Sequence, residues 1–158
     1  MVTFLRRFLV LAALMFWQGG FTFYAAVVVP VGQQVLGSDL EQGFITRQVT
    51  QWLNVAGAVA LVPLAWDVLA AERRRRPWGR WLAVIFLLVT LGVLIALHQR
   101  LDSLLDLETG SVLDRRTFRP LHRVYLWVST AQWGAAVIYA GLTLRAWRLE
   151  DRMLGKGL

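Results

Sequence analysis

Cysteine is absent from this 158-residue chain, and that absence removes several chemistries at once. Disulfide scaffolds, thiolate metal sites, iron–sulfur clusters and cysteine nucleophiles are all excluded. Lysine and histidine are scarce as well, with one lysine and two histidines. The chain also lacks a glycine-rich phosphate loop, a helical HExxH sequence and a nucleophile paired with a base. We therefore expect no catalytic chemistry of the chain's own.

What the chain has in excess is apolar sequence. Hydrophobic residues make up 57% of it and charged residues 17%, and the mean hydropathy is +0.52. A soluble domain of this length would contain more charge and fewer apolar residues. The apolar residues are concentrated in four runs, each long enough to cross a bilayer. We predict one all-α domain, a four-helix membrane bundle with helices at about 5–32, 48–71, 79–98 and 118–148.

The segments between these runs predict their connections. Residues 32–47 contain three glycines and predict a long polar linker. After the third run, leucines and aspartates at helical spacing predict a short amphipathic segment in the outer loop, which in one interpretation extends the third helix to about residue 107. Thr117 is the predicted N-cap of the fourth helix, because Pro120 then falls in the first turn.

Charge divides unevenly between the two ends of these helices. One end has eleven basic residues and four acids, whereas the other has six of each, so the net charges are +7 and zero. The positive-inside rule then predicts that both termini lie in the cytoplasm of a bacterium. On that side the run Arg73, Arg74, Arg75 and Arg76 acts as a topology determinant and attracts anionic lipid headgroups. Because the charges lie at the ends of apolar runs, we expect no nucleic-acid partner.

The fourth run, residues 120–147, has its polar side chains in one line. They recur at alternating steps of three and four residues: His122, Tyr125, Ser129, Gln132, Tyr139 and Thr143, with Ala136 at the remaining step. In a helix this spacing places them on one face, which we call the polar stripe. Since lipid offers no hydrogen-bond partners, we predict that the polar stripe faces the other helices.

Other polar residues lie inside the runs at comparable depths, and the whole set is Gln18, Thr22, Asn54, Thr90, Ser129 and Gln132. Interhelical hydrogen bonds of this kind contribute about 0.6–2 kcal/mol each, so we interpret the set mainly as packing contacts. The alternative is a small cavity for a quinone, a lipid or another amphiphile. Glycines within the runs predict close approach between helices: Gly19, Gly20, Gly57, Gly134 and Gly141.

Asp67 is the only acid inside an apolar run. An ionisable residue in a membrane helix costs about 2.5–3.5 kcal/mol at mid-depth and is therefore a candidate for function. Asp67 lies near the cytoplasmic headgroups, where arginines are close in the predicted topology. We predict a structural ion pair with Arg6, Arg7 or Arg145.

The two histidines support a competing hypothesis. His98 and His122 fall at the outer ends of adjacent predicted helices, and Asp102 is one turn beyond His98. Two imidazoles and a carboxylate suit zinc, copper or non-haem iron, and two imidazoles alone can hold a haem. The sequence therefore leaves open a haem- or metal-binding redox protein, or two histidines on a solvated rim that bind nothing.

Three stretches carry a resemblance to known proteins: FWQGGFTFYAAVVVPVGQQVLGS in the first run, QGFITRQVTQWLN at the start of the second, and FRPLHRVYLWVSTAQW at the start of the fourth. In these the chain resembles small bacterial four-helix membrane proteins of unknown function, loosely similar to the transmembrane-protein-205-like family. The resemblance implies an architecture and no functional residue. We expect a non-catalytic multi-pass protein of the bacterial cytoplasmic membrane, a binding, scaffold or accessory subunit that contacts lipids and either other membrane subunits or copies of itself.

Overall fold

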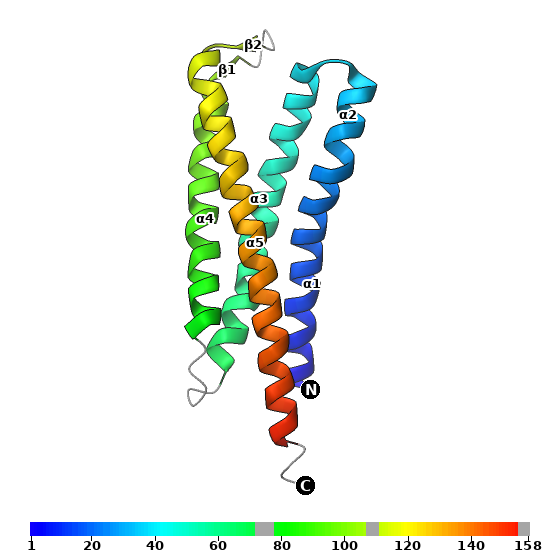
Figure 1. The fold of residues 1–158 in the computed structure, drawn as a ribbon, viewed down its shortest axis with the longest axis vertical. Helices are drawn as coiled ribbons and strands as arrows, with labels where there is room; N and C mark the ends of the chain where they lie inside the picture. The colour runs from blue at the N-terminus through cyan, green and yellow to red at the C-terminus, as the bar shows by residue number, and fades with distance from the viewer. Residues whose placement is uncertain (72–77, 107–110, 155–158) are drawn as a thin grey trace.

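The computed structural model describes residues 1–71, 78–106 and 111–154, and these residues are almost entirely helical. The first helical rod is continuous and comprises α1 (Val2–Phe23), the π-helical turn η1 (Tyr24–Val28) and α2 (Val29–Leu36). It is followed by α3 (Asp39–Ala70), α4 (Trp78–Asp102) and α5 (Arg115–Leu154). The rods run side by side, and the beginning of α1 and the end of α5 lie at the same end of the molecule (Figure 1).

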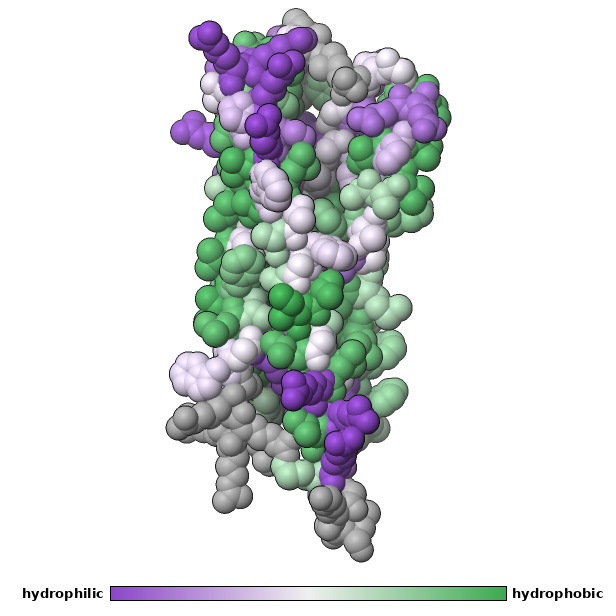
Figure 2. Space-filling view, viewed as in Figure 1, coloured by the Kyte–Doolittle hydropathy of each residue, from purple (hydrophilic) through white to green (hydrophobic). Residues whose placement is uncertain are grey.

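Three of these rods are long and apolar enough to cross a membrane: Val2–Leu36, Glu41–Ala70 and Trp78–Asp102. Less than two fifths of the most apolar segment of each is buried inside the protein, so most of their apolar side chains point outward. Figure 2 shows the result as a broad hydrophobic band with hydrophilic residues above and below it. Such a band would be costly in water and is typical of a surface in contact with lipid. As predicted, these three helices are long and apolar enough to cross a membrane.

The fourth rod, α5, is not among the described helices that are apolar enough to cross a membrane, because its polar residues lower its mean hydropathy. The polar stripe on α5 faces the interior, as its spacing predicts. Tyr125, Ser129, Gln132, Tyr139 and Thr143 are all buried. The interior of the molecule is therefore partly polar along α5, and it also contains polar residues of α3 and α4: Gln42, Asn54, Asp67, Arg80 and Thr90.

Neighbouring helices pack in the order α1, α3, α4 and α5, and α1 meets α5 along a shorter seam. Helices α1 and α3 pack tightly at Gly57, where an added Cβ would lie 2.9 Å from the ring of Trp17. Glycine is needed there because the indole occupies the space of a side chain. Gly20 is in ordinary contact distance of α3, whereas Gly19, Gly134 and Gly141 face open space, so the predicted role in close packing is wrong for those three.

The predicted linker over residues 32–47 is also wrong. The first rod continues to Leu36 and α3 begins at Asp39, so only Gly37 and Ser38 separate them. Gly37 has φ +62°, the left-handed conformation typical of the residue after a helix. The Ser38 hydroxyl then accepts a hydrogen bond from the backbone N–H of Glu41 at 3.4 Å, which caps α3. Two cap signals next to each other make a sharp turn, and the polar residues that follow belong to α3.

A short hairpin, not an amphipathic helix, follows α4. The helix ends at Asp102, and β1 (Leu105–Asp106) pairs antiparallel with β2 (Ser111–Val112). The extension to residue 107 is therefore wrong for the residues that the structure describes, which end on this side at Asp106. Leucines at helical spacing could not exclude the hairpin, since the same residues also suit a turn and a half-buried strand.

The fourth helix begins three residues earlier than predicted, at Arg115, with the Asp114 carboxylate as its cap. That carboxylate accepts hydrogen bonds from the backbone N–H of Arg116 at 2.9 Å and from the hydroxyl of Thr117 at 2.6 Å. The hydrogen bonds from Thr117 hold the pKa of the exposed Asp114 carboxyl below its ordinary value. Thr117 is thus inside the helix and supports the cap, and Pro120 lies beyond the first turn of α5.

Candidate functional site

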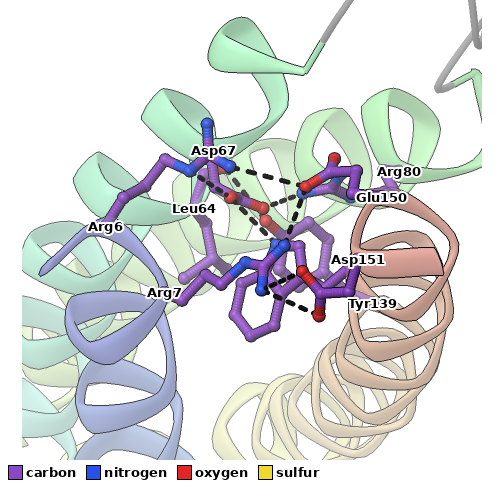
Figure 3. A network of polar contacts seen from close by, with 9 residues as sticks. Arg6, Arg7, Leu64, Asp67, Arg80, Tyr139, Glu150 and Asp151 are labelled. Atoms are coloured by element: carbon purple, nitrogen blue, oxygen red, sulfur yellow. Dashed lines mark hydrogen bonds and ion pairs between the residues drawn. The ribbon is translucent and has the colours of Figure 1, made fainter. Parts of the chain in front are cut away.

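Asp67 lies at the centre of a network of charged residues at the end of the molecule where both termini lie (Figure 3). Its side chain has no solvent exposure. One carboxylate oxygen pairs with Nε of Arg6 at 3.0 Å, and the other pairs with the guanidinium of Arg80. The indole N–H of Trp147 donates a third contact at 3.2 Å. A single carboxylate on α3 is therefore bound by side chains of α1, α4 and α5.

A second layer of ion pairs surrounds this centre. Arg7 donates to Glu150 at 3.1 Å and to Asp151 at 2.9 Å and 3.1 Å, which ties the start of α1 to the end of α5. The guanidinium of Arg7 also lies over the ring of Trp147, 5.4 Å from its centroid. A cation over an indole face is attracted by the negative potential of the ring. This layer is more exposed than the first, and the Asp151 side chain is 58% exposed.

Tyr139 connects the network to the polar stripe. Its hydroxyl donates to the backbone carbonyl of Leu64 at 3.0 Å, and the guanidinium of Arg80 lies 5.9 Å from the centroid of its ring. The carbonyl of Leu64 precedes Asp67 by one turn on α3 and thus faces the same interior. The bond satisfies a buried hydroxyl, which would otherwise cost free energy in the absence of water.

The charges of this network cancel. Three arginines (Arg6, Arg7 and Arg80) are in contact with three acids (Asp67, Glu150 and Asp151). The predicted ion pair of Asp67 with Arg6 is present, whereas Arg7 pairs with the acids of α5 and Arg145 is exposed. Sequence reasoning missed Arg80 as a partner of Asp67, because it is one of the eleven basic residues that predict the cytoplasmic side. No local pattern marks Arg80 as buried, because its partners Asp67 and Tyr139 belong to other helices.

At the opposite end of the molecule, Asp102 is paired with an arginine. Arg47 of α3 donates to both oxygens of Asp102, at 2.7 Å and 3.0 Å. His98 is 3.6 Å from the same carboxylate. This bidentate pair joins α3 to α4 and occupies the oxygens that the metal hypothesis assigned to an ion.

The two histidines have different surroundings. His98 lies beside Tyr125, with ring centroids 6.5 Å apart, whereas His122 stacks on Phe118 at 5.8 Å. Among the residues that the structure describes, no group of three or more histidines and carboxylates is close enough to hold a metal ion. The predicted set of His98, Asp102 and His122 is thus not assembled as a metal site in this geometry.

The predicted packing residues divide into two groups. Two make contacts between helices: Trp133 of α5 donates its indole N–H to Thr22 of α1 at 3.0 Å, and Gln132 donates to the carbonyl of Leu87 on α4 at 3.5 Å. The hydroxyls of Thr90 and Ser129 bond instead to carbonyls of their own helices. Their contribution to interhelical packing is therefore steric.

Gln18 and Asn54 complete that set. Asn54 is buried and interacts with the hydroxyl of Tyr125 on α5. The amide oxygen of Gln18 is buried without a hydrogen-bond partner among the described residues. A further contact, which the sequence did not indicate, joins the Tyr24 hydroxyl to Thr46 at 2.7 Å. The predicted arginine run, Arg73–Arg76, lies outside the described residues.

Comparison of the chain with known protein families, with characterised proteins and with solved structures finds no match.

Proposed function

We propose that the protein is a multi-pass membrane protein in which all four rods cross the bilayer as a four-helix bundle. Both termini would lie in the cytoplasm, where the excess of arginine is located. A bacterial cytoplasmic membrane is the proposed location, in keeping with the resemblance to small bacterial four-helix membrane proteins. This arrangement requires that α5 also spans the membrane, although its mean hydropathy is low.

The outward face of α5 supports that requirement. Between Val124 and Leu144 its exposed residues carry no charge, and the large ones are apolar or tryptophan. Trp127 is 70% exposed and Ile138 is 62% exposed. The polar stripe that lowers the hydropathy lies on the opposite, buried face. A helix of this kind presents an apolar surface to lipid while its polar side chains meet other helices.

Within this membrane we propose a non-catalytic role as a binding, scaffold or accessory subunit. The observation that carries this proposal is the neutral network around Asp67, in which ionisable groups are paired with one another. A catalytic acid or base must reach the group whose proton it transfers, either directly or through one water molecule. Here the carboxylate of Asp67 is already paired with Arg6, Arg80 and Trp147. The network thus stabilises the packing of four helices against one another.

The test is purification of the full chain with an affinity tag after expression in a bacterium. We expect it in the membrane fraction after carbonate extraction, colourless and without stoichiometric metal, and together with other membrane proteins or with copies of itself. A Soret band or bound metal that is lost in both His98→Ala and His122→Ala would overturn the scaffold proposal in favour of the redox alternative. Release of the protein by carbonate would overturn the membrane proposal itself.

A further inference from the structure

A crevice opens between the start of α1 and the end of α5, beside the network around Asp67. It has a volume of about 570 Å³. The residues that line it come from only two helices: Arg7, Leu144, Trp147, Arg148, Asp151 and Arg152. In Figure 2 hydrophilic residues at the lower end of α5 lie directly below the hydrophobic band. The crevice is therefore at the boundary between apolar and charged surface.

The charge of this crevice is not balanced. Arg7 and Asp151 are paired with each other, at 2.9 Å. Arg148 and Arg152 are exposed, and neither has an ion-pair partner among the residues that the structure describes. They are four residues apart, so they lie on one face of α5 one turn from each other. Three arginines against one aspartate leave the lining with a net charge of +2.

The lining also has an apolar part, which a binding site for a small anion would not need. Leu144 is 53% exposed and lies one turn before Arg148 on the membrane side. Trp147, which is buried, forms the wall between the arginines and the interior, with Arg7 over its ring. A ligand that fits must therefore carry negative charge at one end and an apolar chain at the other.

We propose that this crevice binds an anionic phospholipid from the cytoplasmic leaflet. The phosphate would accept hydrogen bonds from Arg148 and Arg152, and an acyl chain would lie along Leu144. Guanidinium groups suit phosphate because they donate several hydrogen bonds in a fixed planar geometry. Basic pockets between membrane helices on the cytoplasmic side are known to bind anionic headgroups. The inference rests on the proposed membrane orientation, and it assigns lipid binding to α1 and α5, in addition to the arginine run between α3 and α4.

The paired residues of the crevice explain why an anionic lipid is favoured over a zwitterionic one. Asp151 is neutralised by Arg7, so it does not oppose a phosphate. A zwitterionic headgroup would bring its own cation next to Arg148 and Arg152, which offsets the attraction to its phosphate. Two arginines near an anionic surface together change the affinity by a factor on the order of tenfold or more.

The experiment is native mass spectrometry of the detergent-purified full chain, titrated with dioleoyl phosphatidylglycerol or with dioleoyl phosphatidylcholine. We expect phosphatidylglycerol to bind more tightly. The double variant Arg148→Gln/Arg152→Gln should weaken it on the order of tenfold. The matched control is Arg115→Gln/Arg116→Gln, which removes the same charge from exposed positions at the other end of α5 and should leave the affinity unchanged.

Three outcomes would overturn the inference. Equal affinity for the two lipids would show no charge selectivity, and equal weakening in both double variants would show only the effect of net charge. Competition by inorganic phosphate at the concentration of the lipid would indicate a site for a soluble anion instead. Two controls on the same variants keep these outcomes distinct from other failures. Far-UV circular dichroism detects misfolding, and carbonate extraction tests the membrane proposal. A helical protein that stays in the membrane fraction but does not select phosphatidylglycerol contradicts the lipid site alone.

Discussion

Removing the charge of Asp67 is the perturbation to which the structure predicts the largest response. The substitution Asp67→Asn keeps the shape of the side chain and removes its negative charge. It leaves Arg80, whose side chain is only 5% exposed, and Arg6, at 12%, without their shared counter-charge. Breaking a buried ion pair by removing one partner typically costs about 3–5 kcal/mol. We expect a loss of unfolding free energy in that range.

Asp151→Asn provides the matched comparison within the same network. The chemical change is identical, but the Asp151 side chain is 58% exposed and its partner Arg7 keeps Glu150. Exposed pairs contribute about 0–1 kcal/mol, so this variant should unfold almost as the unmodified protein does. The assay is denaturant unfolding in mild detergent, followed by far-UV circular dichroism.

The pairing can be separated from other effects by a double-mutant cycle with Arg80→Gln. Because each single substitution leaves the other charge buried, the double variant should be more stable than the sum of the two single effects, by about 0.5–3 kcal/mol. Additive effects would refute the pairing of Asp67 with Arg80. Equal, small losses in Asp67→Asn and Asp151→Asn would refute the idea that burial makes the difference.

Three further variants test separate parts of the fold. Gly57→Ala should lower the free energy of unfolding by about 1–3 kcal/mol, because its Cβ would overlap the ring of Trp17. Gly92→Ala, at an open position, should leave it unchanged or raise it slightly in the same assay. A larger loss for Gly92→Ala than for Gly57→Ala would contradict the α1–α3 contact. Tyr139→Phe should cost about 0.5–1.5 kcal/mol through the lost bond to a backbone carbonyl of α3, and no change would contradict that bond. The pKa of Asp114 is lowered, so its stabilisation of α5 is present above the ordinary carboxyl pKa and is lost as the pH falls through the lowered value. The free energy of unfolding of Asp114→Ala should therefore depend less on pH in the acid range. The same pH dependence as in the unmodified protein would exclude the cap.

The long helices and the inward direction of the polar stripe were predictable because both depend on local periodicity. Asp67 could be assigned a structural pair, and one of its partners, Arg6, was among those predicted. Residues in a membrane helix have few options, so an acid near the headgroups pairs with a nearby arginine. What could not be predicted was Arg80 as the second partner. Its burial depends on how closely α4 and α5 pack, which no local pattern records.

The connections were the least predictable part, although one signal was present. Ser38 and Glu41 stand at the spacing of a helix cap directly after Gly37, and they mark a turn of two residues. The polar composition of residues 32–47 suggested a linker because glycine and glutamine are common in loops. The partner of Asp102 could not be predicted either, because it depends on a contact between helices. Arg47, which binds Asp102, is far from it in the sequence and belongs to another helix.

Cysteine accessibility in cells tests the membrane arrangement most directly, because the chain has no cysteine of its own. Single cysteines are introduced at five exposed positions: Val2, Val35, Leu113, Ile138 and Met153. They are then treated with a membrane-impermeant maleimide before and after permeabilisation. A bundle with both termini in the cytoplasm predicts labelling of Val35→Cys and Leu113→Cys in intact cells, of Val2→Cys and Met153→Cys only after permeabilisation, and of Ile138→Cys in neither. Labelling of Ile138→Cys would contradict this arrangement. So would labelling of Val35→Cys or Leu113→Cys from the same side of the membrane as Val2→Cys or Met153→Cys.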